Sequence, residues 1–265
     1  MNVILRKIKN IAKRVLNVKS IFLLNESYVY PEEWIKSRTF YGQYGEDIKI
    51  WQLFKNTSVP GFFLEIGAME GIRFSNTYFF EKKGWKGICV EPHPYYFNLL
   101  RKNRGGSIMI QAAVGAADAE ETVFYSNYRG SMSTLDKSLE GYFKKHYKPF
   151  FGGFKEIKVP LMTLNSILSK ENISSPIDIL SIDVEGTEAD VLKGLNMKKY
   201  SPRVIVAEIS IRKDPVMNFL RDAGYFFSCS NNSNAIFCKT EDDAETVRCA
   251  NVVGMQIVNR HPLEK

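Results

Sequence analysis

The stretch Phe-Phe-Leu-Glu-Ile-Gly-Ala-Met-Glu-Gly, at residues 62–71, decides the fold class of this chain of 265 residues. Its first half is almost wholly apolar, which predicts a buried strand. Two glycines follow with the spacing Gly67-x-x-x-Gly71, and the pattern beyond them predicts a helix over about 75–83 that ends at Gly84. A buried strand that leads through a glycine loop into a helix is typical of a parallel sheet covered by helices.

The same alternation of strand and helix recurs along most of the chain. Further buried strands are predicted at residues 87–92, 107–114, 177–183 and 204–209, and helices at about 46–55, 94–103, 187–194 and 214–223. Two last strands, at 225–229 and 235–239, are joined by an asparagine-rich turn. We therefore expect an α/β fold with a mostly parallel sheet of about five strands, helices on both faces and a C-terminal antiparallel hairpin.

The region from about residue 127 to 158 interrupts this alternation. It is rich in glycine, aromatic residues and lysine, and a helical pattern lies near 135–147. We interpret it as an insertion that covers a site like a lid. An extra strand is expected at 121–126, and another helix beyond Val159. The main domain is then expected to span 39–240, and the pattern predicts no structure for the mixed-charge extension at 241–265.

Composition excludes several classes of protein. Hydrophobic residues make up 45% and charged residues 25%, as in an ordinary globular protein. No stretch approaches the ~20 apolar residues that a membrane-spanning helix needs. The four cysteines lack the spacing of metal ligands, and there are only three histidines. We therefore expect neither a zinc site nor a disulfide scaffold. We expect a reducing, cytoplasmic location.

The net charge of +7 is concentrated at one end of the chain. Six basic residues and no acidic ones lie in residues 1–20, which leaves +1 for residues 21–265. A nucleic-acid enzyme would spread Lys and Arg over its binding face, so we expect no nucleic-acid partner. Apolar residues recur at helical spacing between these charges, so residues 1–38 are expected to form a basic amphipathic extension. Three interpretations stay open: a helix packed on its own domain or on a partner subunit, a helix on an anionic membrane surface, or a disordered tail.

Ligands of such sheets bind beyond the carboxyl ends of the strands, so the residues that follow each strand are the first candidates. The loop with Gly67 and Gly71 lacks the third glycine of the dinucleotide fingerprint. The carboxylate of Glu65 would repel a pyrophosphate but suits a ligand with an amino group, such as the methionine portion of S-adenosylmethionine. Glu91 ends the second strand, where a carboxylate can accept protons from both ribose hydroxyls. The alternatives are a tight turn without a ligand and, for Glu91, a surface acid.

Acidic residues also gather after two later strands. Asp183, Glu185 and Glu188 follow one strand, and Glu208 ends the next. Desolvation disfavours carboxylates at buried strand ends, so stability does not explain this group. We expect Asp183 to face the reactive part of a cofactor, a substrate or a metal, and with Glu208 it could act as a base or hold a hard cation. Glu185 and Glu188 could instead serve the dipole of the following helix.

The order and spacing of several motifs resemble the FkbM family of S-adenosylmethionine-dependent methyltransferases over roughly residues 40–240. The matching motifs lie at residues 41–47, 63–68, 75–81, 84–92, 131–135, 163–164 and 182–188. The resemblance implies a class I methyltransferase fold, S-adenosylmethionine as cofactor, and methyl transfer to a hydroxyl of a sugar, a glycan or a polyketide-type metabolite.

The resemblance and the strand-end positions together give a set of expected site residues. The expected cofactor-binding residues are Gln43, Glu65, Gly67, Ala68, Gly71, Ser75, Asn76, Glu91, Pro92, Gln111, Ala112 and Asp183. The expected catalytic residues are Asp183, Glu185 and Glu208. A base that needs no metal is favoured slightly over a divalent metal, because no histidine or third carboxylate with obvious spacing completes a metal site.

The chain departs from the family pattern at two positions. Such sequences usually have Asn where this chain has Met69, and Asp where it has Asn165. Backbone groups are expected to do most of the binding at Met69, and a catalytic acid other than residue 165, such as Asp183, is then needed. Three other functions stay open: an N-methyltransferase, a nicotinamide oxidoreductase, or an inactive binding protein with a methyltransferase fold. The missing third glycine argues against the oxidoreductase.

Overall fold

The computed structural model describes residues 40–127, 131–147, 151–174, 176–231 and 233–250. The predictions made for residues 1–38 lie outside the described residues, as do those for the end of the chain beyond 250. No helix in the described ranges is long and apolar enough to cross a membrane.

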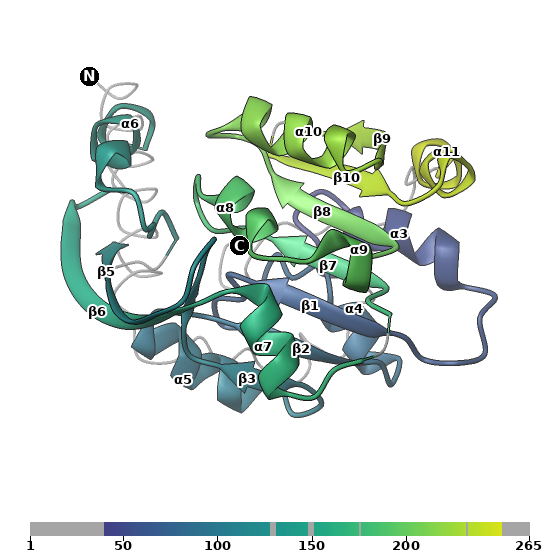
Figure 1. Ribbon diagram of the computed structural model, residues 1–265, viewed down its shortest axis with the longest axis horizontal. Coiled ribbons are helices and arrows are strands. Elements are labelled where there is room, and N and C mark those ends of the chain that lie inside the picture. The colour runs from purple at the N-terminus through teal and green to yellow at the C-terminus, as the bar shows by residue number, and fades with distance from the viewer. Residues whose placement is uncertain (1–39, 128–130, 148–150, 175, 232, 251–265) are drawn as a thin grey trace, which may run out of the picture. The chain divides into compact units, whose positions relative to one another are not determined.

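A seven-stranded sheet with the order β3-β2-β1-β7-β8-β10-β9 forms the centre of the domain (Figure 1). Its strands are β1 Phe62–Ile66, β2 Lys86–Val90, β3 Ile108–Ile110, β7 Ile179–Ile182, β8 Val204–Glu208, β9 Phe226–Ser230 and β10 Asn234–Cys238. The first five strands of the order are parallel, and β10 is antiparallel to both β8 and β9. The predicted parallel sheet with a C-terminal hairpin is therefore confirmed.

The register brings the carboxyl ends of the central strands to one edge of the sheet. Glu65 of β1 pairs with Cys89 of β2 on one side and with Ser181 of β7 on the other. Ile182 of β7 pairs with Ala207 of β8. The residues that follow these strands are thus neighbours, although more than a hundred positions of the chain separate β1 from β7.

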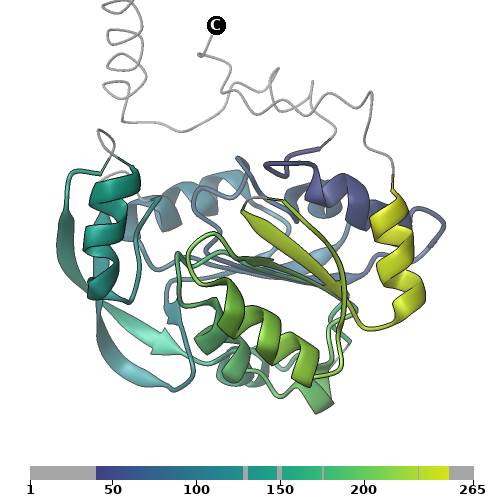
Figure 2. The same cartoon turned by 90° about the horizontal axis from the view of Figure 1, so that it is seen from above.

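Helices cover both faces of this sheet (Figure 2). On one face lie α7 Leu164–Lys170, α8 Glu188–Lys193, α9 Met197–Tyr200 and α10 Lys213–Asp222, and on the other α3 Glu46–Phe54, α4 Tyr78–Lys82 and α5 Pro94–Asn103. The first face packs Leu64 and Ile205 against the buried side chains of the helices, such as Leu192. The second face is aromatic, with Phe80 and Trp85 4.8 Å apart between ring centroids.

A second, three-stranded sheet corrects two sequence expectations. It contains β4 Ala113–Val114, β5 Ala119–Asn127 and β6 Phe154–Met162 in the order β4-β6-β5. The single strand expected at 107–114 is divided, because the chain leaves the large sheet after Ile110 and enters the small one at Ala113. The insertion expected to reach residue 158 ends earlier, since β6 already pairs with β5 at Phe154. The polar residues of β6 hide its strand pattern in the sequence.

The segment between β5 and β6 contains the helical turn that the sequence predicted near 135–147. A short 3₁₀ helix, Lys137–Leu139, leads into α6 Glu140–His146. Phe143 of α6 is fully buried against Phe151, with ring centroids 5.5 Å apart. This small aromatic core holds the segment together.

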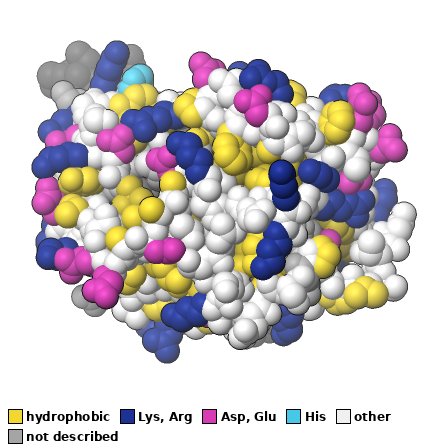
Figure 3. Space-filling model, viewed as in Figure 1, with side chains coloured by type: hydrophobic (Ala, Val, Ile, Leu, Met, Phe, Trp, Pro, Cys, Tyr) yellow, Lys and Arg dark blue, Asp and Glu magenta, His cyan; other side chains and the backbone are white. Residues whose placement is uncertain are grey.

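Helix α11, Glu241–Cys249, covers residues for which the sequence predicted no structure. The hydroxyl of Thr240 accepts the N–H of Asp243 and caps its first turn. The helix contacts β9 and α3, and Lys49 of α3 donates to the carbonyl of Ala250 at 3.1 Å. The compact part of the chain therefore continues past residue 240. On the face shown in Figure 3, Lys and Arg lie scattered among acidic and apolar side chains.

Candidate functional site

A pocket lies where the parallel strands β1, β2 and β7 end. Six residues predicted from the sequence line it: Gly67, Glu91, Pro92, Ala112, Asp183 and Glu185. The segment between β5 and β6 adds Ser131, Ser133 and Leu135 to its wall. The insertion therefore borders the site, as its interpretation as a lid requires.

Gly67 brings the loops after β1 and β7 into direct contact. Its φ angle is 82°, and its N–H donates to the carbonyl of Val90 at 2.9 Å. A Cβ atom at this position would overlap the carbonyl oxygen of Asp183. Only glycine combines this left-handed backbone with so close an approach. Met69, two residues later, also has a positive φ of 47°, and its N–H donates to Glu91, which follows β2.

Glu91 sits at the end of β2 with both carboxylate oxygens bound to backbone. Oε2 accepts the N–H of Met69 and Oε1 accepts the N–H of His93, each at 2.8 Å. The side chain is 5% exposed, and this burial raises its pKa to about 7, although the two N–H groups act in the opposite direction. Each oxygen keeps a second lone pair, so the carboxylate can still accept hydroxyl protons from a ligand in the pocket.

Asp183 and Glu208 lie side by side, as predicted, because β7 and β8 are parallel neighbours. Asp183 is open to solvent in the recess, yet the surrounding protein and the charge of Glu188 raise its pKa to about 7. The register places Asp183 directly after Ile182 of β7, beside Glu208 at the end of β8. Glu208 is nearly buried, accepts a short hydrogen bond from Ser210, and has its pKa raised well above the usual value by burial and by Glu185. A carboxyl with a raised pKa is a stronger base near neutral pH.

Glu185 and Glu188 have different contacts. Glu185 lines the pocket, and its Oε1 accepts the N–H of Met132 at 3.0 Å, which joins the loop after β7 to the insertion. Burial, followed by the charge of Asp183, raises its pKa to about 8. Glu188 is 1% exposed and accepts the N–H groups of Val184 and Gly186 at 3.1 and 3.0 Å. These contacts hold the loop after β7, and the helix-dipole role of Glu188 stays a prediction.

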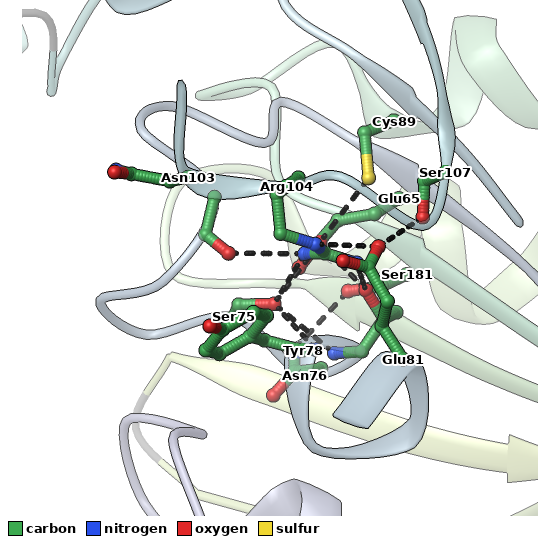
Figure 4. A network of polar contacts seen from close by, with 12 residues as sticks. Glu65, Ser75, Asn76, Tyr78, Glu81, Cys89, Asn103, Arg104, Ser107 and Ser181 are labelled. Atoms are coloured by element: carbon green, nitrogen blue, oxygen red, sulfur yellow. Dashed lines mark hydrogen bonds and ion pairs between the residues drawn. The ribbon is translucent and has the colours of Figure 1, made fainter. Parts of the chain in front are cut away.

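Several predicted cofactor residues lie outside the pocket lining. Glu65, Ser75 and Asn76 belong to a buried polar network around Arg104 (Figure 4). In that network the hydroxyl of Ser75 donates to Glu65 at 3.0 Å, and the amide of Asn76 donates to the hydroxyl of Ser181 at 3.1 Å. The lining also omits Gln43, Ala68, Gly71, Gln111 and Glu208. Their roles in binding or catalysis stay predictions.

Sequence reasoning missed the buried Arg104 and the apolar wall of Phe124 and Leu135. Arg104 follows the exposed Arg101, so the local pattern is that of an ordinary basic helix end. The structure also shows the surroundings of residue 165, where family sequences usually have Asp. Asn165 lies at the start of α7 and accepts the N–H of Asn196 at 2.8 Å. It therefore joins two helices and does not line the pocket.

The described residues contain no group of three or more His, Cys, Asp or Glu side chains arranged to hold a metal ion.

Comparison with known proteins gives one family and a set of distant folds. A model of the FkbM methyltransferase domain matches residues 65–227. A search of curated proteins finds no match. Among solved structures, the chain is similar to precorrin-6y C5,15-methyltransferase from Geobacter metallireducens, with 12% identity, 80% of this chain and 93% of that chain covered, and a TM-score of 0.42.

Two further structures are similarly distant. A TehB-like SAM-dependent methyltransferase from Corynebacterium glutamicum shows 8% identity over 88% of this chain and 97% of that chain, with a TM-score of 0.39. The N-terminal domain of human METTL16 in complex with SAH shows 14% identity over 75% of this chain and 68% of that chain, with a TM-score of 0.38.

Proposed function

The chain belongs to the FkbM methyltransferase family, and on that premise we propose that it transfers a methyl group from S-adenosylmethionine to a hydroxyl of a sugar, a glycan or a polyketide-type metabolite. The observation that carries the proposal is the set of carboxylates at one edge of the sheet, with Glu91 after β2 and Asp183 after β7 in the same pocket.

The residues of the pocket fit this cofactor. Glu91 is placed to accept ribose hydroxyls, and the apolar side chains of Val90, Phe124 and Leu135 can pack against a flat base. S-adenosylmethionine carries a positive sulfonium and a positive ammonium group, and both are favoured beside carboxylates. When bound, it would supply an electrophilic methyl group. A phosphate-rich dinucleotide would instead meet repulsion from the same acids.

Asp183 is the proposed base. The carboxylate of Asp183 would take the hydroxyl proton of the acceptor as that oxygen receives the methyl group. Its pKa of about 7 makes it a better proton acceptor than an ordinary aspartate, while a useful fraction stays ionised at neutral pH. We propose that Glu208, which ends the neighbouring strand, acts together with Asp183 in accepting this proton. Alignment of the acceptor supplies the rest of the acceleration.

An amine acceptor is the second candidate. The loop after β7 and the end of β8 carry Asp183, Glu185 and Glu208 close together, and a substrate ammonium group would be attracted to them. One of these acids would then remove an ammonium proton before transfer.

Mass spectrometry of cellular glycans and lipid-linked sugars, with and without the gene, tests the proposal. We expect species heavier by one CH₂ group to disappear on deletion and to return with the wild-type gene but not with Asp183→Asn. Fragmentation assigns the methyl to oxygen or nitrogen and so separates the two candidates. Methylated species that persist at full level in the deletion strain would contradict both.

For its location, we propose a cytoplasmic enzyme that touches the inner face of the membrane through residues 1–20. The support is the basic amphipathic pattern of that segment, in which each Lys or Arg near an anionic surface adds ~1 kcal/mol of attraction.

A further inference from the structure

Arg104 is a fully buried cation directly beneath the loop that follows β1. It comes immediately after α5, has no exposed surface, and lies over the rings of Phe63 and Tyr78 at 5.4 and 5.2 Å. A buried guanidinium is strongly disfavoured unless its donors are satisfied. The contacts it makes therefore indicate what it holds in place.

The guanidinium donates to three successive parts of the chain (Figure 4). Nη1 donates to Oε2 of Glu65 at 2.9 Å and to the carbonyl of Gly71 at 3.0 Å. Nη2 donates to the hydroxyl of Thr77 at 3.1 Å, and Nε donates to Oε2 of Glu81 at 2.9 Å. Arg104 thus joins strand β1, the loop after it, and helix α4.

Gly71 is packed against the stem of Arg104 as well as bonded to its head. Its φ angle is 85°, and an added Cβ atom would lie 2.6 Å from Cγ of Arg104. The loop from Gly67 to Gly71 is thereby fixed at three points. Gly67 is bound to β2, Met69 to Glu91, and Gly71 to Arg104.

Arg104 binds only one of the two carboxylate oxygens of Glu65. Its Oε2 accepts from Arg104 and from the hydroxyls of Ser75 and Thr77. Its Oε1 makes no hydrogen bond in the described part of the chain. The charge of Glu65 also raises the pKa of Asp183, so this carboxylate acts on the site.

We propose that Arg104 is a positioning residue for cofactor binding: it holds Glu65 and the carbonyl of Gly71 so that the loop between Gly67 and Gly71 keeps the shape that binds S-adenosylmethionine. The inference rests on the proposed function and adds to it a residue that does not line the pocket. A lysine could keep the charge, but one ammonium group with three donors cannot reach all five acceptors that the planar guanidinium reaches.

The test compares Arg104→Lys with Arg101→Met, which changes an exposed arginine in the last turn of α5. S-adenosylhomocysteine binding is measured by titration at a temperature where circular dichroism shows both variants folded. We expect Arg104→Lys to bind about tenfold or more weakly, the change expected for one lost charge-assisted hydrogen bond, and Arg101→Met to bind as wild type. In turnover, KM for S-adenosylmethionine should rise while kcat at saturation changes little.

Arg104→Lys keeps the buried positive charge and so preserves the fold better than a neutral residue would. Hydrogen exchange gives a second measurement. Amides of residues 67–76 should exchange faster in Arg104→Lys than in wild type without ligand. An Arg104→Lys protein that melts lower but binds S-adenosylhomocysteine as tightly as wild type would reduce Arg104 to a structural residue. If the wild type itself fails to bind, the proposed function is contradicted, and unchanged exchange in the variant would overturn the positioning role separately.

Discussion

Replacing Glu91 with Gln perturbs the predicted cofactor site at a single atom and a single charge. Both carboxylate oxygens of Glu91 accept backbone N–H groups, from Met69 and His93, at 2.8 Å. An amide at this position must therefore turn its NH₂ group toward one of two N–H donors. Glu91→Gln both removes the negative charge that the ribose hydroxyls would meet and disturbs the Met69 end of the loop.

The size of the effect follows from these contacts. Hydrogen bonds to a charged group contribute about 1.5–3 kcal/mol, so losing one such contact should weaken S-adenosylhomocysteine binding by roughly 10- to 100-fold. The pH dependence adds a second signature. Because the pKa of Glu91 is about 7, its ionised fraction falls below neutral pH, and affinity that depends on ionisation should fall by about tenfold per pH unit.

The stability of the folded chain depends on pH in the opposite direction to the affinity. Glu91 has a pKa of about 7 in the folded chain against a usual value of 4.5, so the folded state binds this proton more tightly. Its ionisation therefore lowers the free energy of unfolding as pH rises from 4.5 to 7, by roughly 3 kcal/mol in total. The stability difference between wild type and Glu91→Gln should accordingly shift against wild type across this window.

The assay is calorimetric titration of S-adenosylhomocysteine into wild type and Glu91→Gln from pH 5.5 to 8.5. The difference between the two profiles isolates Glu91 from Asp183, which titrates in the same range. Asp183→Asn serves as control and should move the midpoint lower, because the charge of Asp183 helps to raise the pKa of Glu91. Equal affinities and parallel pH profiles for wild type and Glu91→Gln would refute the reasoning.

Three further predictions concern catalysis, the loop and the N-terminal segment. Asp183→Asn should keep the fold but lose most turnover, measured as kcat, and near wild-type turnover would place the base elsewhere. Loss of wild-type activity with EDTA, restored by Mg²⁺ or Mn²⁺, would show metal assistance instead of a carboxylate base. Gly67→Ala should lower the free energy of unfolding by more than about 2 kcal/mol, because its Cβ atom would overlap the backbone of Asp183 at a positive φ. Thermal denaturation measures this loss, and a melting temperature like that of wild type would contradict the described loop. Deleting residues 1–20 should abolish sedimentation with anionic vesicles and leave cofactor affinity unchanged, whereas equal sedimentation would favour a packing helix.

The parts of the site that follow from strand ends could be predicted from the sequence. Apolar runs mark β1, β2, β7 and β8, and parallel strands bring their ends to one edge. The sequence alone therefore places Asp183 and Glu208 as neighbours, and Glu91 at the same edge of the sheet. Gly67 could be placed for the same reason, although the overlap with Asp183 that makes glycine necessary is a contact between distant segments.

Long-range partners could not be predicted in this way. The position of Glu65 at a strand end predicts contact with a ligand. In the structure, one of its carboxylate oxygens accepts a hydrogen bond from Arg104, 39 residues later in the chain. No periodicity distinguishes the buried Arg104 from the exposed Arg101. Helix α11 is different, because Thr240 followed by three acids in the first turn is a recognisable start signal of a helix. The many charged residues of the segment nevertheless made it resemble an unstructured extension.

The central claim is that the pocket at the ends of β1, β2 and β7 binds S-adenosylmethionine. Calorimetric titration of the wild-type chain with S-adenosylhomocysteine tests it most directly, with NADH titrated in parallel. We predict saturable binding of one S-adenosylhomocysteine per chain, competed by S-adenosylmethionine, and no binding of NADH. Tight NADH binding together with no response to S-adenosylhomocysteine would contradict the account.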